Sequence, residues 1–258
     1  PDKWKSYASM AVTPTSSYYA DAMAAAAYEN ADDNARIGKP LDRTRWGMTT
    51  PTVNAYYSPT MNEIVFPAGI LQPPFFDPKA DDAANYGAIG MVIGHEMTHG
   101  FDDQGRKYDA AGNLRDWWLP EDELRYKERA AHVASQYGGY EVLDGQKING
   151  QLTLGENIAD LGGLKIAYVA FRKTPEGKAK EKIDGFTPDQ RFFLSYAQIW
   201  RGKMRPEAQR MRLLTDPHSP GRFRVLGPLF NMPEFFEAFG ATPEKAHGHL
   251  NPTPVSIW

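Results

Sequence analysis

Two histidines and a glutamate stand close together in the segment His95-Glu96-Met97-Thr98-His99, which fits the pattern H-E-x-x-H. If the segment is helical, residues four apart lie on one face with about 5–6 Å between their Cβ atoms, so both imidazoles can bind one metal ion. Glu96 is then angled so that its carboxylate reaches a water molecule on that ion. The pattern predicts a zinc site with His95 and His99 as ligands and Glu96 as the base, although so short a pattern also recurs in unrelated proteins.

The position of a third ligand separates the classes of zinc site that share this pattern. One class needs glycine at position 102 and histidine at position 105, where this chain has Asp102 and Gly105. Another class needs a glutamate at position 118 or 119, where this chain has Trp118 and Leu119. The chain therefore fits neither class. The remaining option is a distant glutamate on a second helix, and Glu156 supplies it.

Glu156 and Asp160 share one face of that expected helix, so one can ligate the ion while the other accepts a hydrogen bond from a ligand histidine. The alternative is a capping glutamate and an exposed aspartate. Two histidines, one carboxylate and a water molecule make the open site of catalytic zinc, whereas a structural site favours four protein ligands and would leave Glu96 without a task. In the catalytic case zinc activates its bound water, and Glu96 takes the proton and passes it to the leaving amine.

Helix signals dominate the rest of the chain. Two β-rich runs, 53–57 and 63–66, surround a turn that contains Pro59 and predict a hairpin. We expect a capping box between Thr153 and Glu156 at the start of one helix. The class is therefore α+β, mainly α. The expected helices cover residues 16–36, 80–101, 120–137, 153–172, 188–202 and 232–239.

Composition limits the kind of metal site and the kind of partner. The 258 residues include no cysteine, so histidines and carboxylates must hold any metal. A formal net charge of -3 gives no basic excess for nucleic-acid binding. No apolar run approaches the roughly 20 residues of a membrane span. The chain begins at Pro1 without a secretory signal and reads as a piece of a longer bacterial protein, which we expect to be exported (periplasmic, cell-surface or secreted).

Five stretches, one of which contains the histidine motif, indicate the protein family. They are Val53–Tyr57, Ile64–Phe76, Gly90–Asp103, Leu154–Asp160 and His218–Arg224. Together they resemble the catalytic region of the neprilysin family of zinc metallopeptidases, which includes endothelin-converting enzymes and bacterial oligopeptidases. The resemblance implies a thermolysin-like zincin catalytic lobe with an edge-strand hairpin beside the zinc helix. It also implies that 51–258 is the catalytic domain, and that 1–50 is a connecting helix and linker from a missing N-terminal lobe.

The resemblance implies roles for residues outside the metal motif. Asp160 looks like the partner of a zinc histidine, and Asp102 like a second such partner. His218 looks like the donor that stabilises the oxyanion of the transition state, although a solvated loop histidine is the alternative. Arg224 looks like the residue that grips a substrate carbonyl.

The resemblance also implies how a peptide would bind. Asn54 and Ala55 would form the strand edge that holds the substrate main chain. An apolar pocket would take the residue after the cut, so that short peptides are hydrolysed on the amino side of bulky hydrophobic residues. The residues at the matching positions, which could also be ordinary core, are Ile70, Phe75, Met91, Val92, Ile199 and Trp200.

Two features depart from the family. The chain ends Val255-Ser-Ile-Trp258 where members commonly end Cys-x-x-Trp, and it lacks the helical lobe that covers the cleft. The expected partners are therefore peptide substrates and that missing lobe, with no nucleic acid. Rival hypotheses are a peptide-binding fragment that does not turn over without the lobe, and a structural zinc module. We expect one zinc per chain, because His247 and His249 have the spacing of surface histidines rather than of a second site.

Overall fold

The computed structural model describes residues 5–242 and 254–257, so His247 and His249 lie outside the described residues. The chain divides into two compact units, Pro1–Thr49 and Thr50–Trp258. This division falls next to the boundary expected at residue 50. The assignment of the first segment to a separate lobe stays a prediction.

The described residues of the first unit form one helix, α1 (Tyr18–Asn34), within the range expected from the sequence. The Ser17 side chain caps the helix by accepting a hydrogen bond from the Ala20 backbone N–H. No residue between 5 and 49 is buried. The unit therefore has no hydrophobic core among its described residues.

The second unit is mainly helical, and the two small sheets among its described residues are two-stranded hairpins. Its elements in chain order are β1 (Tyr56–Ser58), β2 (Glu63–Val65), the 3-10 turn η1 (Ala68–Ile70), α2 (Asp82–Asn85), the π-helical turn η2 (Tyr86–Gly90), α3 (Met91–His99), the 3-10 turn η3 (Gly105–Lys107), α4 (Pro120–Gly138), β3 (Glu141–Leu143), β4 (Gln146–Lys147), α5 (Leu154–Phe171), α6 (Pro175–Lys178), α7 (Pro188–Ile199), α8 (Pro206–Thr215), α9 (Gly221–Leu229) and α10 (Pro233–Phe239). The mainly helical class predicted from the sequence is confirmed.

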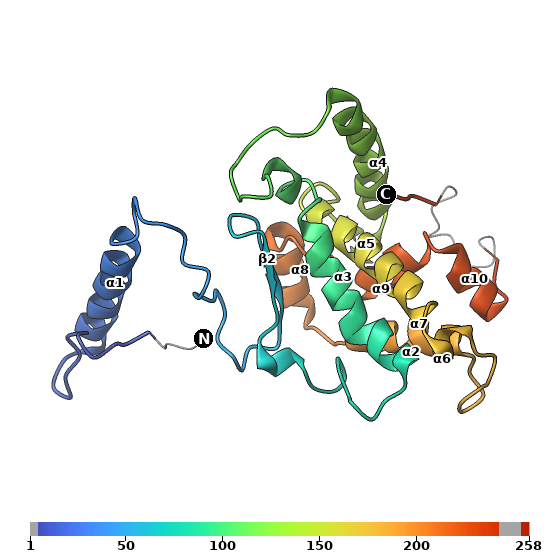
Figure 1. Ribbon diagram of the computed structural model, residues 1–258, viewed down its shortest axis with the longest axis horizontal. Coiled ribbons are helices and arrows are strands. Elements are labelled where there is room, and N and C mark those ends of the chain that lie inside the picture. The colour runs from blue at the N-terminus through green and yellow to red at the C-terminus, as the bar shows by residue number, and fades with distance from the viewer. Residues whose placement is uncertain (1–4, 243–253, 258) are drawn as a thin grey trace. The chain divides into compact units, whose positions relative to one another are not determined.

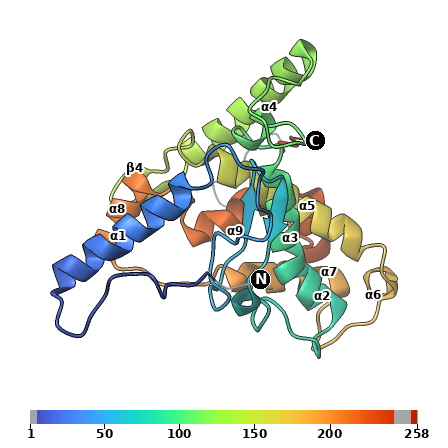
Figure 2. The ribbon, with the colours of Figure 1, turned by 60° about the vertical axis from the view of Figure 1, so that its left-hand side comes forward.

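The predicted hairpin is present beside α3, as Figure 2 shows for β1, β2 and α3. Its antiparallel register pairs Tyr56 with Val65 and Tyr57 with Ile64. The first strand begins at Tyr56 rather than at residue 53, so Asn54 and Ala55 precede it. A second hairpin, β3–β4, was not predicted. It turns through Asp144 and Gly145, whose φ angles of 51° and 78° suit a tight hairpin turn.

The helix predicted over 80–101 is built from α2, η2 and α3 in succession. The Asp81 side chain caps its start by accepting from the Ala84 N–H, and α3 ends at His99. The capping box predicted for α5 is wrong, because the Thr153 side chain makes no cap hydrogen bond. Its hydroxyl donates to the Asn149 carbonyl and accepts from the Asn157 side chain instead.

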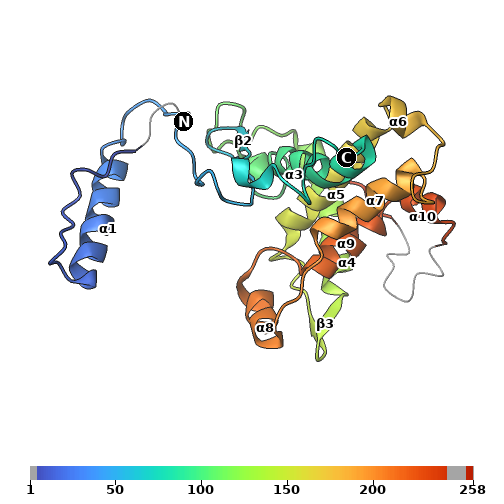
Figure 3. The same ribbon diagram turned by 90° about the horizontal axis from the view of Figure 1, so that it is seen from below.

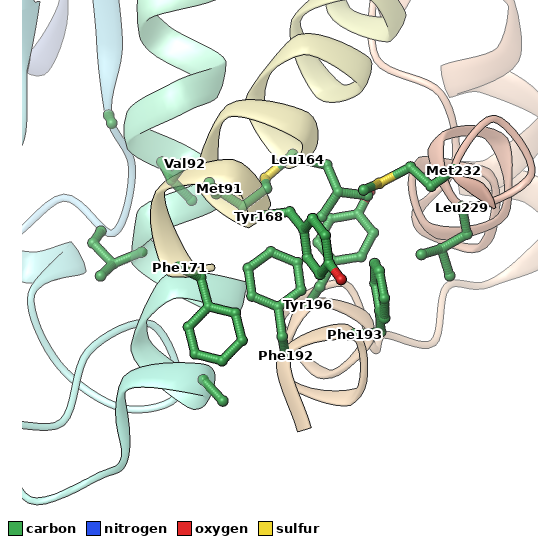
Figure 4. Close-up of a cluster of buried hydrophobic side chains, with 14 of the residues drawn as sticks. Met91, Val92, Leu164, Tyr168, Phe171, Phe192, Phe193, Tyr196, Leu229 and Met232 are labelled. Atoms are coloured by element: carbon green, nitrogen blue, oxygen red, sulfur yellow. The ribbon is translucent and has the colours of Figure 1, made fainter. Parts of the chain in front are cut away.

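Two hydrophobic clusters flank α5. The first lies among α3, α5 and α7 and is shown in Figure 4. Its centre is aromatic, with Phe171, Phe192, Phe193 and Tyr196 almost fully buried. The second lies among α4, α5 and α9 and includes Ile257 near the end of the chain. Within the described part of the chain, no helix combines the length and apolar character needed to cross a membrane.

Candidate metal centre and active site

Helices α3 and α5 cross with their backbones in contact, and they run side by side in Figure 1. A Cβ atom added to Gly163 would lie 2.5 Å from the His95 backbone nitrogen. One added to Gly94 would lie 2.7 Å from the Gly163 carbonyl oxygen. Only glycines allow this approach, which places the acidic side chains of α5 opposite the histidines of α3.

The predicted ligands meet at this crossing. The Nε2 atoms of His95 and His99 lie 3.0 Å apart. The two carboxylate oxygens of Glu156 lie 3.3 Å from His95 Nε2 and 3.7 Å from His99 Nε2. Glu96 is buried beside them, and one atom each from His95, Glu96 and His99 lie within 4.8 Å of one another.

These distances suit a zinc ion. Metal bonds of about 2.0–2.1 Å in a tetrahedral site place ligand atoms roughly 3.3 Å from one another, close to the three separations of this centre. Glu156 Oε2 is buried and has no hydrogen-bond partner within the described structure. A metal ion would supply the partner that this oxygen lacks.

A carboxylate oxygen lies within 2.8 Å of Nδ1 of each imidazole. Asp160 Oδ1 lies 2.8 Å from Nδ1 of His95, and Asp102 Oδ2 lies 2.7 Å from Nδ1 of His99. A proton on each Nδ1 leaves both Nε2 atoms as acceptors that face one another, an unfavourable arrangement unless a cation lies between them. Asp102 is itself fixed, because its other oxygen accepts the N–H groups of Gln104 and Gly105 at 2.8 and 2.7 Å.

Arg224 is buried at the same centre. Its Nε and Nη2 donate to the two oxygens of Asp160 at 2.8 and 2.6 Å. Its guanidinium lies 3.9 Å from the centre of the Trp200 ring, a cation–π distance. Arg224 thus binds the carboxylate that orients His95, which the sequence did not reveal. The predicted grip on a substrate carbonyl stays a prediction.

His218 lies across the centre on the segment between α8 and α9. Its Nε2 is 3.2 Å from Glu156 Oε1, and its side chain is 40% exposed, so the imidazole borders open space. Its Nδ1 lies 2.7 Å from Asp216 Oδ1. Sequence reasoning missed Asp216, although the Asp-x-His spacing is the signal of a carboxylate that holds an imidazole.

Charge and burial set the protonation of the acidic groups. Burial raises the pKa of Glu96, which suits a base that must accept a proton. Burial also acts to raise the pKa of Glu156, but the close approach of His95 outweighs it and holds that pKa well below its usual range. Burial opposes ionisation of Asp160 as well, yet the charge of Arg224 keeps its pKa lowered.

The structure gathers the predicted pocket residues into one region, the first hydrophobic cluster. Ala55 is buried in the same cluster, whereas Asn54 is exposed. Met91 and Val92 lie on α3, and Figure 4 shows them at the edge of the aromatic cluster. Their use as a substrate pocket stays a prediction. The predicted pocket residues that are fully or partly buried in this cluster are Ile70, Phe75, Met91, Val92, Ile199 and Trp200.

The fold and the imidazole–carboxylate centre define a zincin. Residues 54–252 match the family model described as Peptidase family M13. The chain therefore belongs to peptidase family M13, the neprilysin family, which confirms the family predicted from the sequence.

Relatives and solved structures agree with this assignment. The chain is 46% identical to neprilysin-3 of Drosophila melanogaster, over 98% of this chain and 32% of that protein. It is 51% identical to endothelin-converting enzyme 1 of Bos taurus, over 81% of this chain and 28% of that protein. The zinc metalloprotease ZMP1 of Mycobacterium tuberculosis, solved in complex with inhibitor, superposes with a TM-score of 0.93 at 44% identity, over 100% of this chain and 40% of that chain. The structure of PepO from Lactobacillus rhamnosis superposes with a TM-score of 0.85 at 35% identity, over 96% of this chain and 38% of that chain. The chain thus spans about a third of the length of the curated relatives it matches.

Proposed function

We propose that this chain carries the catalytic centre of a zinc-dependent endopeptidase that hydrolyses short peptides on the amino side of bulky hydrophobic residues. The observation that carries the proposal is the pair of Nε2 atoms 3.0 Å apart, each imidazole oriented by its own carboxylate. His95, His99 and Glu156 would hold the ion. When bound, zinc would lower the pKa of a water molecule and polarise the scissile carbonyl.

The chain's own side chains would move the proton and stabilise charge. Glu96 takes the proton of the attacking water and delivers it to the leaving amine. With a proton on each ring nitrogen, His218 would donate from Nε2 to the oxygen on which negative charge develops, and Asp216 would hold the ring in the orientation that this requires. Arg224 and the edge at Asn54 and Ala55 would hold the peptide main chain.

The apolar cluster beside α3 supports a preference for a bulky side chain after the cut. A pocket lined by Met91, Val92 and Trp200 would bury such a side chain, and burial of a large apolar side chain contributes about 1.5–3 kcal/mol. A structural zinc module would explain neither the buried Glu96 nor His218 at the open side of the centre.

Replacing each glutamate separately tests the proposal. Glu96→Gln should keep one zinc per chain but lower the rate of peptide hydrolysis by about 10²–10⁴, because it removes the base and leaves the ligands in place. Glu156→Gln should instead lower the zinc content. Metal analysis and steady-state kinetics on a peptide with Phe or Leu after the cut measure both.

The exposed Glu181→Gln is the matched control, and it should change neither quantity. If Glu96→Gln lost its zinc and kept full activity per bound ion, Glu96 would be structural. If the unaltered protein bound zinc and peptide without cutting it, the chain would be a binding fragment.

A further inference from the structure

The segment between α7 and α9 leaves the zinc centre and returns to it. It begins after Trp200, whose ring lies against Arg224, and it ends at His218, which faces Glu156. The helix within it, α8, has no buried residue. Figure 3 shows α8 standing away from the helices that form the core of this unit. The residues of this segment therefore border the candidate active site at both ends.

This segment is strongly basic in a chain whose formal net charge is -3. Two of its arginines have acidic partners, since Arg210 pairs with Asp144 and Arg212 with Asp216. Three more cations, Arg201, Lys203 and Arg205, are exposed and form no ion pair with any residue that the structure describes. They alternate along five residues that directly follow Trp200, and the only acidic residue from 201 to 215 is Glu207.

The position of these cations relates them to the substrate. Ile199 and Trp200 belong to the apolar cluster that would receive the residue after the cut. The chain continues from there into Arg201, Lys203 and Arg205, so these cations directly follow two of the residues that would line the pocket.

We propose that Arg201, Lys203 and Arg205 form a basic rim that recognises a carboxylate on the substrate, one or two residues beyond the side chain in the apolar pocket. The carboxylate belongs either to an Asp or Glu side chain or to the C-terminus of a short peptide. This inference rests on the proposed peptidase function and names a class of preferred substrate. Long-range attraction between the rim and an acidic peptide also raises the rate of encounter, and salt weakens it.

The chain offers a matched control for this rim. Lys178, Lys180 and Lys182 also alternate along five residues, are exposed and form no ion pair with described residues. They lie at and after the end of α6, which Figure 3 shows on the opposite side of the unit from α8. Replacing either set by alanine removes the same charge from the protein.

The test compares four peptides that carry Phe after the cut. In three of them the next residue is Glu, Gln or Lys and the C-terminus is amidated. The fourth has Gln at that position, followed directly by a free C-terminal carboxylate. The measured quantity is the ratio of kcat/KM for each charged peptide to that for the neutral one. Because exposed ion pairs are individually weak, we expect the unaltered enzyme to prefer Glu over Gln by about three- to tenfold at low salt.

The variant R201A/K203A/R205A should bring that ratio close to one, and K178A/K180A/K182A should leave it unchanged. The charge reversal R201E/K203E/R205E should favour the Lys peptide. Loss of preference for the free-carboxylate peptide alone would identify the C-terminus as the ligand. An unchanged ratio in the rim variants, or an equal loss in the control, would overturn the inference. Failure of the unaltered enzyme to cut the Gln peptide would instead contradict the proposed function.

Discussion

A single buried carboxylate, Asp160, contacts both Arg224 and His95 at the centre of the site. Its oxygens receive both Nε and Nη2 of Arg224, and Oδ1 also lies 2.8 Å from His95 Nδ1. Burying an unpaired carboxylate would be costly, but the buried guanidinium compensates its charge. The position of the carboxylate beside His95 therefore depends on Arg224.

His218 provides the sharpest prediction for a single side chain. His218→Ala should lower kcat by about 10²–10³, or roughly 3–4 kcal/mol, with little change in zinc content, because the oxyanion that it stabilises exists only in the transition state. Steady-state kinetics with metal analysis measure this. His132→Ala, on the exposed face of α4, is the control and should leave kcat unchanged. A rise in KM alone would assign His218 to ground-state binding.

Residue spacing predicted the part of the site that one helix can encode. His95, Glu96 and His99 follow from helix geometry, and Glu156 and Asp160 from the same rule on a second helix. The contact between Arg224 and Asp160 joins α9 to α5 and depends on packing that no local pattern contains. The partnership of Asp216 with His218 was missed because it depends on the conformation of the turn that joins them.

At the scale of elements, the backbone contact between α3 and α5 sets the geometry of the centre. Gly94 and Gly163 lie against one another, and Gly162 lies against the Thr98 side chain. A wider separation would move Glu156 and Asp160 away from the imidazoles. The glycines thus hold the candidate metal ligands of the two helices close together.

Gly163→Ala should lower both the stability of the fold and its zinc content. The new Cβ would lie 2.5 and 2.8 Å from backbone atoms of His95, which cannot move without moving the imidazole. Overpacking of this kind costs about 1–3 kcal/mol. Urea unfolding with metal analysis tests this. Gly138→Ala, where a Cβ would meet nothing within 4 Å, is the matched control and should change stability by less than about 1 kcal/mol. Equal effects of the two substitutions would contradict the close-contact argument.

The sequence predicted long helices better than short elements. The helices α4, α5 and α7 carry clear apolar faces, and their ends lie within three residues of the expected bounds. The helix α8 was missed because it has no buried face, so no hydrophobic period marks it. The helix α9 was missed because it contains Pro228, which breaks helical patterns.

At the scale of the whole molecule, the two units differ in how they are stabilised. Unit Thr50–Trp258 contains both hydrophobic clusters and the complete candidate site. Residues 5–49 contain no buried side chain, and Tyr18 and Tyr19 of α1 are 90% and 73% exposed. Apolar side chains that remain in water contribute little to folding. The stability of this chain therefore arises in the second unit.

Removing residues 1–49 should accordingly leave the free energy of unfolding unchanged within about 1 kcal/mol, because apolar burial contributes roughly 25 cal/mol per Å² and the described part of this segment buries no side chain. Chemical denaturation of the full and shortened chains provides the comparison, and their zinc contents should also agree. Ile257→Ala is the sensitive control, since Ile257 is 5% exposed in the second cluster and its loss should cost about 2–5 kcal/mol. A shortened chain that unfolds as readily as that variant would show that the first unit stabilises the second, and the two would then have to be treated as one folding unit.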